Sequence, residues 1–548
     1  MIVINLSKIS LILGARPIFS ELDWRIQNDQ KIGLIGPNGA GKSSLFKLIS
    51  GEFAAEPGGR VIFAKDISFG YLAQDPELPP DQTAFETALA GNPRWRDLQA
   101  ALKQVEIEMG DPRVYNNPKA LTRAIEAHER HLEEYLALGG DSYPERVRQV
   151  LSGLGLDPGE HDKTISTLSG GQKKLVGLAR LLLAQPPVLL LDEPDNHLDL
   201  NGKAYLEQLI QTYPGAVVIV SHDRYLLDAV VTHIAELEDG RLTTFQGDYS
   251  SFVMEKELRL ARQEELYRVQ QREIHRLAAA IKRYALWGKV YDNEKFAARA
   301  RAMQNRLDRM DKIERPIIER KRMAVELSGW RGSTKVLEIC GLEKSFDGQT
   351  LFQGLDIQLQ HGQRAGLIGP NGAGKSLLLR IILGNELADA GEIKVGPSIV
   401  TGYYAQEHET LDPEMTLIDT VRYAVPEGRS MSESNAVAFL SRYLFTYQQA
   451  TQKVGDLSGG ERSRLQIALL VLSGANFLLL DEPTNNLDIA SAEVLEQALD
   501  EFEGTVLVIS HDRYFLDRVV DRILVLEAGE IHAYPGNYSD YAERKQSR

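Results

Sequence analysis

The decapeptide LIGPNGAGKS occurs twice in this chain of 548 residues, at positions 34–43 and again at 367–376. The loop G-x-x-x-x-G-K-S within each copy follows an apolar run typical of a strand (KIGLI or RAGLI) and precedes a run typical of a helix (SLFKLI or LLLRII). A glycine-rich loop between a strand and a helix, ending in Gly-Lys-Ser, binds nucleotide phosphates on its backbone N–H groups. The lysine reaches the β- and γ-phosphates and the serine binds Mg²⁺. We therefore predict two nucleotide-binding loops in an α/β fold.

The similarity between the two halves extends beyond these loops. Lys42 matches Lys375 at an offset of 333, and the shared motifs described below follow both loops in the same order. The offset falls by 43 residues, from 332 at Gln74 to 289 at Leu168. The chain is therefore a duplicated domain whose first copy carries an insertion, which we place on the helix-like stretch 94–138.

The segment between the two copies is long and helix-like. We predict a first domain at 1–249, a helical-hairpin linker at 250–330 and a second domain at 331–548. Residues 250–285 contain neither proline nor glycine, and such a helix would measure about 54 Å at about 1.5 Å per residue. A return helix is indicated by apolar residues spaced by four and three, namely Phe296, Ala300, Met303, Leu307 and Met310. We expect the turn of this hairpin near Gly288.

Composition and charge exclude several classes of protein. The apolar fraction of 43% and the charged fraction of 25% are ordinary for globular domains. The apolar runs are far shorter than the roughly 18 residues of a membrane span, and the single cysteine, Cys340, excludes an internal disulfide or a cysteine metal site. The net charge is −15, yet residues 250–325 carry +8 and the remainder −23. We expect a cytoplasmic protein in which two acidic domains flank a basic linker, with neither membrane nor DNA as partner.

Adjacent carboxylates end a strand-like run in each copy, PVLLLDEP at 187–194 and NFLLLDEP at 476–483. The first carboxylates, Asp192 and Asp481, suit Mg²⁺. The second, Glu193 and Glu482, suit the polarisation of an attacking water.

A histidine and a glutamine recur in both copies. The runs VIVSHD and LVISHD place His222 and His511 at strand ends, where an open α/β sheet gathers groups that contact ligands. We predict that both histidines act in catalysis. Gln74 and Gln406 end the runs GYLAQ and GYYAQ and are predicted to sense Mg²⁺ or the water, an ordinary surface glutamine being the alternative.

The runs LSGGQ at 168–172 and LSGGE at 457–461 each lead into a helix-like stretch. Together with the phosphate loops, they resemble the ATP-binding cassette superfamily. The resemblance implies that the Ser-Gly-Gly turn of one cassette caps the γ-phosphate held by the other, so that two ATP molecules lie between the cassettes.

The predicted ATP and Mg²⁺ ligands follow from these motifs. For ATP they are, in the first copy, Gly36, Asn38, Gly39, Gly41, Lys42, Ser43, Ser44, Gln74, Ser169, Gly170, Gly171 and Gln172. In the second copy they are Phe346, Gly369, Asn371, Gly372, Gly374, Lys375, Ser376, Gln406, Ser458, Gly459, Gly460 and Glu461. For Mg²⁺ they are Ser43, Gln74, Asp192, Ser376, Gln406 and Asp481.

Residues 281–306, around the expected turn of the hairpin, hold seven Lys and Arg against two acidic residues, with aromatic residues interleaved. Basic and aromatic side chains at a protruding tip suit RNA, through phosphate neutralisation and base stacking. The predicted RNA contacts are Lys282, Arg283, Trp287, Lys289, Lys295, Arg299 and Arg301. The alternative is a solvated helical face whose aromatic residues, including Tyr284 and Tyr291, pack the turn. An amphipathic helix on a membrane surface is less favoured, because the partner helix of the hairpin explains the apolar seam.

Tandem cassettes, the charged helical linker, the insertion before the first signature, and the segments GDYSSF at 247–252 and GNYSDY at 536–541 closely resemble the ABC-F family. The resemblance covers essentially the whole chain. It implies a cytosolic ATPase that binds the ribosome in the tRNA exit site when closed on ATP, with the linker directed toward the peptidyl transferase centre. It also implies contacts with rRNA and exit-site tRNA, a monomer with intramolecular cassette pairing, and a role in relieving stalls or protecting from antibiotics. The insertion resembles the family's arm, although its near-neutral charge fits an ordinary surface helical pair equally well.

Other functions stay open at this point. The ATPase subunit of a transporter would bind a separate membrane protein and would not need the basic hairpin. A DNA-maintenance ATPase and a passive RNA-binding scaffold are further alternatives. Association with ribosomes that depends on ATP distinguishes the ribosomal function from these three.

The two copies differ at positions that concern nucleotide binding. Phe346 suits stacking on adenine, whereas its counterpart is Leu13, so the first site is expected to hold the base less tightly. After the paired carboxylates the first copy has Asp195 where the second has Thr484. We expect both sites to hydrolyse ATP, at unequal rates.

Overall fold

The computed structural model describes residues 1–14, 16–65, 67–74, 76–290, 294–310, 323, 325–327, 330–346, 349–405, 411–425 and 430–546. The chain forms two compact units. One comprises Met1–Asp248 with Met323–Arg548 and contains both repeats, and the other is Tyr249–Arg322.

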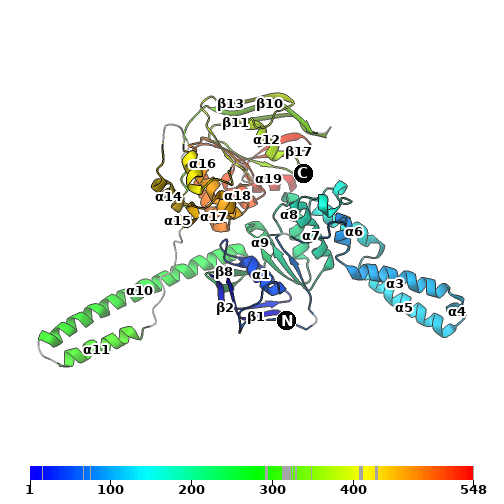
Figure 1. Ribbon diagram of the computed structural model, residues 1–548, viewed down its shortest axis with the longest axis horizontal. Coiled ribbons are helices and arrows are strands. Elements are labelled where there is room, and N and C mark those ends of the chain that lie inside the picture. Colours follow the sequence, from blue (N-terminus) through cyan, green and yellow to red (C-terminus); the bar gives the residue numbers. More distant parts are fainter. Residues whose placement is uncertain are drawn as a thin grey trace. The chain divides into compact units, whose positions relative to one another are not determined.

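A six-stranded sheet in the order β5-β6-β7-β3-β8-β9 organises the first repeat (Figure 1). Its neighbours are parallel except for β9, which pairs with β8 antiparallel. The strands are β3 (Lys31–Ile35), β5 (Phe69–Leu72), β6 (Val188–Asp192), β7 (Ala216–Val220), β8 (His233–Glu238) and β9 (Arg241–Gln246). The central strands β3, β6 and β7 are buried at every residue, which explains their continuous apolar runs. Because these three strands are neighbours, the segments that follow them meet at one edge of the sheet.

The second repeat has the same sheet, in the order β14-β15-β16-β12-β17-β18. Its strands are β12 (Arg364–Ile368), β14 (Thr401–Tyr404), β15 (Phe477–Asp481), β16 (Thr505–Ile509), β17 (Arg522–Glu527) and β18 (Glu530–Pro535). The prediction of two α/β cassettes in one chain is therefore confirmed.

A three-stranded antiparallel sheet accompanies each large sheet, in the orders β2-β1-β4 and β11-β10-β13. The strands are β1 (Ile2–Leu13), β2 (Arg16–Gln27), β4 (Arg60–Phe63), β10 (Lys335–Phe346), β11 (Gln349–Gln360) and β13 (Ala390–Val395). In the first repeat, helix α1 (Lys42–Ser50) joins both sheets in one apolar cluster: its Phe46 is buried with Ile4 of β1 and Leu190 of β6. This packing holds the start of α1, and with it the phosphate loop, in a fixed position.

Further helices cover the sheets. In the first repeat they are α2 (Ala84–Leu89), α6 (Tyr143–Gly153), α7 (Gly170–Ala184), α8 (Leu200–Gln211) and α9 (Arg224–Val230). In the second they are α12 (Lys375–Ile382), α13 (Leu417–Tyr423), α14 (Glu433–Arg442), α15 (Tyr447–Ala450), α16 (Gly459–Leu472), α17 (Ile489–Asp500), α18 (Arg513–Val519) and α19 (Tyr538–Gln546).

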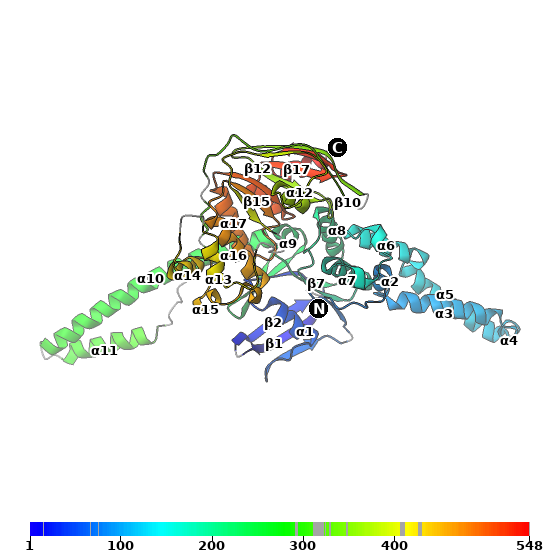
Figure 2. The same ribbon diagram turned by 45° about the horizontal axis from the view of Figure 1, so that its top comes forward.

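The stretch 94–138, predicted as a helical insertion, lies on α3 (Pro93–Gly110), α4 (Pro112–Tyr115) and α5 (Pro118–Ala137). Figure 2 shows α3 and α5 side by side, with α4 between them at their far end. Each helix starts with proline after an Asn or Asp whose side chain accepts a backbone N–H, an arrangement that sets sharp helix starts. At the base, Trp95 stacks on Tyr135 and contacts Tyr143, and its Nε1 donates to Gly140 O at 2.8 Å.

The second unit is the hairpin of α10 (Tyr249–Val290) and α11 (Glu294–Asp308), which run side by side (Figure 1). With 42 residues, α10 spans about 63 Å. The turn expected near Gly288 is confirmed to within a few residues, since α10 continues through this glycine to Val290 and α11 begins at Glu294. A single glycine costs about 1 kcal/mol in a helix, which a long paired helix tolerates. Within the ranges given above, no helix is both long enough and apolar enough to cross a bilayer.

Candidate functional site

The two phosphate loops require glycine for steric reasons. A Cβ on Gly36 would lie 2.2 Å from the carbonyl oxygen of Leu237, and one on Gly369 equally close to that of Leu526. Gly41, at the start of α1, has φ +98°, and a Cβ there would lie 2.4 Å from the Ile18 side chain. The loops are therefore held against neighbouring strands in a conformation that leaves their N–H groups available for phosphate oxygens.

The loop lysines point back into their own loops. Lys42 Nζ donates to Gly36 O at 2.7 Å, and Lys375 Nζ donates to Gly369 O at 2.9 Å. Burial lowers the pKa of Lys42, and the nearby Glu193 opposes this effect. Each ammonium group is thus positioned at the loop, where it can exchange carbonyl partners for phosphate oxygens.

Asp192 has the properties of a Mg²⁺ ligand. It ends β6, is 2% exposed and bonds the hydroxyl of Ser43. Its Oδ2 has no hydrogen-bond partner among the residues that the structure describes, and burial raises the pKa of this carboxyl group. Within the same residues no group of three or more His, Cys, Asp or Glu forms a ready-made metal site. A carboxylate and a hydroxyl therefore fit an ion that takes its other ligands from nucleotide phosphates and water. Asp481 holds the equivalent position in the second repeat, also 2% exposed.

The glutamates that follow have a strained backbone. The φ of Glu193 is +49° and that of Glu482 is +47°, in the left-handed region that costs a non-glycine residue about 1 kcal/mol or more. The N–H of each is tied to the adjacent strand, donating to Val220 O at 2.8 Å and to Ile509 O at 2.9 Å respectively. The main-chain bonds hold both carboxylates beyond the strand ends, at the edge where the phosphate loop lies.

Different neighbours orient the two glutamates. Glu193 accepts a hydrogen bond from Asn196 Nδ2 at 2.7 Å, whereas Glu482 accepts one from the His511 backbone N–H at 3.2 Å. Burial, with a smaller contribution from Asp481, raises the pKa of Glu482 to about 8, and burial raises the pKa of Glu193 as well. A raised pKa makes each carboxylate, in its ionised form, a stronger proton acceptor.

The two predicted histidines lie at the same edge of their sheets, and their rings are uncharged. Burial, and then the charge of Lys42, lower the pKa of His222 to about 3, and burial lowers the pKa of His511 well below its usual value. Neither ring nitrogen of His222 has a hydrogen-bond partner in the described part of the chain. The Nε2 of His511 lies 3.6 Å from Glu482 Oε1. A neutral imidazole in this position can donate one N–H to a phosphate oxygen.

Each phosphate loop contacts the other repeat. The Asn38 backbone N–H donates to Asp488 Oδ2 and its Nδ2 to Asn486 O, both at 3.0 Å. In the converse direction, Asn371 Nδ2 donates to His197 O at 2.9 Å. The loop that follows the paired carboxylates of each repeat therefore contacts the phosphate loop of the other repeat.

The signature turn of the second repeat also meets the first phosphate loop. A Cβ on Gly460 would lie 3.0 Å from the Asn38 side chain. On the other side, a Cβ on Gly171 would lie 3.1 Å from the His197 ring. Since His197 contacts the second phosphate loop, the two repeats are arranged head to tail, with parts of both repeats at each phosphate loop.

The signatures themselves start helices α7 and α16 with reciprocal caps. The side chain of Gln172 accepts from Ser169 N, and that of Glu461 accepts from Ser458 N, each at 2.9 Å. Gly170, Gly171, Gly459 and Gly460 form the first turns, whose N–H groups suit a phosphate. Since Gln172 and Glu461 are engaged in capping, the glycines and serines are the better candidates for nucleotide contact.

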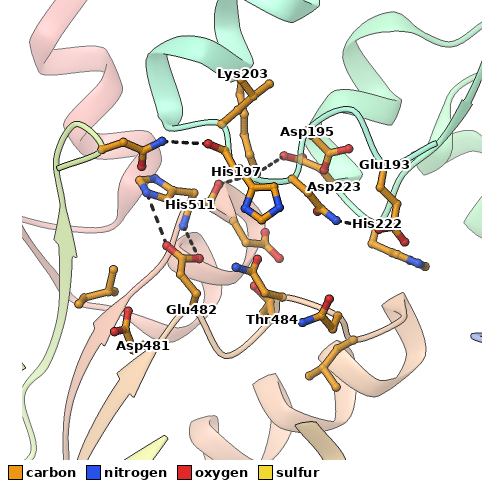
Figure 3. Close-up of a pocket in the computed structure, with 18 of the residues that line it drawn as sticks. Glu193, Asp195, His197, Lys203, His222, Asp223, Asp481, Glu482, Thr484 and His511 are labelled. Carbon is orange, nitrogen blue, oxygen red and sulfur yellow. Dashed lines mark hydrogen bonds and ion pairs between the residues drawn. The ribbon is translucent and has the colours of Figure 1, made fainter. Parts of the chain in front are cut away.

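A cavity of about 340 Å³ lies between the repeats and brings the glutamates and histidines of both sites together with part of the second phosphate loop (Figure 3). Its lining includes the glutamates and histidines of both sites with their neighbours, namely Glu193, Asp195, His197, Lys203, His222, Asp223, Asp481, Glu482, Thr484 and His511.

Two ion pairs that sequence reasoning missed join the repeats. Arg224 pairs with Glu496, and Arg513 pairs with Glu207. Each arginine also covers an aromatic ring of the other repeat, Arg224 at 3.8 Å from the ring centre of Tyr514. The two pairs are equivalent because both partners are related by the offset of 289. The available signal was the Arg-Tyr that follows Ser-His-Asp in both copies.

Three of the residues predicted to bind nucleotide are not among the groups described above. Gln74 is exposed just beyond β5. Phe346 ends β10, is 45% exposed and has Lys344 Nζ 4.8 Å from its ring centre, so its face remains a candidate for adenine; its counterpart Leu13 is 37% exposed. Gln406 lies outside the described residues.

The basic residues predicted to bind RNA are exposed on α10 and α11; they are Lys282, Arg283, Lys289, Lys295, Arg299 and Arg301. The aromatic residues instead contact one another. Trp287 packs edge-on against Tyr284 and Phe296, with ring centres 5.7 Å apart in both contacts, and Arg283 lies over Tyr284 and Trp287. Trp287 is 37% exposed. The packing that sequence analysis left open as the alternative is therefore present, and Tyr291 lies outside the described residues.

Comparison with known proteins adds to this geometry. A family model described as ABC transporter matches residues 19–196 and 352–485, and a second model with the same description matches residues 235–327. The chain is 35% identical over 548 residues to the energy-dependent translational throttle protein EttA of Haemophilus influenzae, covering 97% of this chain and 93% of that protein. It is 31% identical over 531 residues to ABC transporter F family member 5 of Arabidopsis thaliana, covering 96% of this chain and 75% of that protein.

A solved structure of an archaeal ribosome recycling factor, aABCE1, in complex with the ribosomal stalk protein aP1 has the same fold. Its TM-score is 0.60 at 18% identity, over 98% of this chain and 92% of that chain. At this identity the likeness concerns the fold alone.

Proposed function

Because this chain belongs to the ABC transporter family, and within it to the ABC-F group with two cassettes in one chain, we propose that it is an ATP-hydrolysing factor of the ribosome. The observation that carries the ATPase part is the crossing of the two repeats at the phosphate loops, Asn38 to Asn486 and Asn371 to His197. Since each ATP would touch both repeats, nucleotide binding favours the closed pair, and loss of the γ-phosphate removes part of the interface.

The residues of the first site divide the chemistry as follows. Lys42 and the N–H groups of its loop bind the phosphates, while Ser43 and Asp192 would hold Mg²⁺, which when bound neutralises charge on the β- and γ-phosphate oxygens. Glu193 orients the attacking water and accepts its proton, and neutral His222 donates to the γ-phosphate. In the second site Lys375, Ser376, Asp481, Glu482 and His511 take the same roles.

The ribosome is proposed as partner on the strength of relatives and of charge. The Haemophilus influenzae relative is named a translational throttle, and it aligns with nearly the whole chain. The hairpin of α10 and α11 offers exposed basic side chains that suit rRNA phosphates. Because the tip aromatics pack on one another, we assign RNA contact chiefly to the basic residues, with the exposed part of Trp287 adding to it.

The finer proposal is that the ATP-closed form binds in the cytoplasm to the tRNA exit site, contacting rRNA and exit-site tRNA as a monomer. The hairpin then acts on the peptidyl transferase centre, relieving stalls or protecting from antibiotics. This follows the ABC-F resemblance of the whole chain, together with the length and charge of the hairpin.

Sedimentation of the Glu193→Gln, Glu482→Gln double variant with cell lysate tests this function. The variant should retain ATP without hydrolysing it and should travel with ribosomes only when ATP is present. Replacing the six basic hairpin residues by glutamine should abolish this co-sedimentation while leaving ATP binding intact. The matched control is a variant with glutamine at six exposed positions of helices α3, α4 and α5. Sedimentation with membranes, or none with ribosomes, would overturn the proposal in favour of a transporter subunit or another partner.

A further inference from the structure

The ion pairs and the Arg-Tyr contacts between the two repeats recur at the offset of 289. Some interface residues differ between the repeats, as His197 differs from Asn486. Another difference is Asp195 with Lys203, whose counterparts are Thr484 and Ala492. An acid and a base are thus replaced together by two uncharged residues, so the net charge of the two halves is unaffected by the exchange. All four residues line the cavity between the repeats.

Lys203 is buried, and its ammonium group has two firm partners. Its side chain is 9% exposed, and Nζ donates to Asp223 Oδ2 at 2.8 Å and to the carbonyl oxygen of His511 at 2.9 Å. Burial alone would lower the pKa of Lys203, but the carboxylates of Asp223 and Asp195 raise it above its usual value. The side chain is therefore charged, and it belongs to the first repeat while it bonds the second.

The bond from Lys203 leads directly to the second ATP site. His511, whose carbonyl it holds, donates its backbone N–H to Glu482 at 3.2 Å and faces the same carboxylate with its ring. The counterpart of Lys203 in the second repeat is Ala492, whose methyl group cannot donate a hydrogen bond to the His222 carbonyl. In the first site Asn196 orients Glu193 instead.

Asp195 completes this arrangement. It is 6% exposed, bonds the hydroxyl of Ser221 and interacts electrostatically with Lys203 and Asp223. Figure 3 shows Asp195, Lys203 and Asp223 on the side of the first repeat, with His511 and Glu482 on the facing side. The acid compensates the buried charge of Lys203 without contacting nucleotide ligands of the second site.

We propose that Lys203, supported by Asp223 and Asp195, is a positioning residue that the first repeat supplies to Glu482 and His511 of the second ATP site. The inference rests on the proposed ATPase function and makes the two sites unequal: hydrolysis at the second site depends on this lysine, and hydrolysis at the first site does not. Lys203 acts through His511 and touches no reacting atom.

Site-resolved hydrolysis tests the proposal. The Glu193→Gln background isolates the second site, the Glu482→Gln background isolates the first, and single-turnover hydrolysis with protein in excess avoids any limitation by reopening. Asp195→Thr with Lys203→Ala copies the residues of the second repeat into the first and conserves net charge. In the Glu193→Gln background it should lower the hydrolysis rate constant by about tenfold or more, with the half-saturating concentration changed less than about twofold. In the Glu482→Gln background the rate constant should change less than about twofold. Lys163→Ala, on the exposed surface of the first repeat, is the control in both backgrounds.

Equal losses in the two backgrounds would overturn the inference, since they would indicate a general effect on folding or closure. The reverse exchange, Thr484→Asp with Ala492→Lys, provides a second test that does not require removal of a buried charge pair. It should raise the rate constant at the first site severalfold and leave that of the second site within about twofold; no gain at the first site would count against the mechanism. If the wild-type chain does not hydrolyse ATP, the proposed ATPase function is itself wrong. This outcome can be distinguished from an equal loss of hydrolysis in the two backgrounds.

Discussion

Removing the carboxylate charge of Glu496 should weaken closure of the two cassettes much more than the same change at Glu207. The side chains of Glu496 and Arg224 are 0% and 3% exposed, so their pair is shielded from water. Breaking a buried pair by removing one charge costs about 3–5 kcal/mol. Glu496→Gln keeps an acceptor oxygen for an Arg224 N–H, and this hydrogen bond should recover about 1–2 kcal/mol of that cost. We therefore expect a net loss of about 2–3 kcal/mol, which is about 30- to 150-fold in the closure equilibrium.

The pair of Glu207 with Arg513 supplies the matched control. Glu207 is 15% exposed, and Arg513 keeps a second carboxylate, Asp223, at 3.8 Å. Solvent and the remaining partner should reduce the cost of Glu207→Gln to about 1 kcal/mol, which is about fivefold in the same equilibrium.

Fluorescence energy transfer can measure this closure with little engineering. Cys340 is the only cysteine of the chain and is exposed. Ser7, its counterpart at the offset of 333, can be changed to cysteine to carry the second label. In the Glu193→Gln, Glu482→Gln background, the ATP concentration for half-maximal transfer should rise in the order wild type, Glu207→Gln, Glu496→Gln. The reasoning is refuted if Glu207→Gln has the larger effect, or if Arg224→Met with Glu496→Leu closes no better than Glu496→Gln alone.

Three further predictions concern other parts of the molecule. Gly41→Ala places a Cβ 2.4 Å from Ile18 and should lower affinity for a fluorescent ATP analogue about 100-fold, whereas Gly58→Ala, also at positive φ but in open space, should change it less than about threefold. Burial and a neighbouring lysine lower the pKa of His222 to about 3, so between pH 6.5 and about 3 the unfolded chain binds a proton that the folded chain does not, and stability falls as the pH drops. Without nucleotide, the Tm of His222→Gln should therefore fall less between pH 7 and pH 4.5 than the Tm of the wild type. An equal fall in both proteins would contradict this. Trp95→Ala should cost about 3–5 kcal/mol locally and speed hydrogen exchange in α3 and α5, with ATP affinity unchanged; unaltered exchange in both helices would show that the stacked ring does not anchor them.

The fold of the cassettes follows from local sequence because the decisive features are local. A glycine loop between a buried strand and a helix has few structural solutions, and its recurrence at a fixed offset implies a second copy of the same sheet. The paired carboxylates and histidines could be placed at one edge for the same reason, since parallel strands bring their carboxyl ends together. The turn of the hairpin was predicted near Gly288, and α10 continues just past this residue to Val290, because a glycine within a long paired helix does not have to end it.

The contacts between the repeats could not be predicted in this way. Arg224 and Glu496 lie 272 positions apart, and neither residue belongs to a motif that specifies a partner. Likewise, the aromatic residues of the linker tip suit either a platform for base stacking or a packed turn. Only the distances between Tyr284, Trp287 and Phe296 show that these rings pack on one another. Their contact with RNA stays a prediction.

The reciprocal pairs Arg224–Glu496 and Arg513–Glu207 are the contacts that a two-fold symmetric homodimer would make. In a homodimer every substitution appears on both sides of the axis, so a lysine that reaches one active site must reach the other as well. In a single chain each half carries its own residues, and Lys203 can face His511 while Ala492 faces the opposite half. Covalent fusion of the two cassettes thus permits an order of events between two sites that symmetry would keep equivalent.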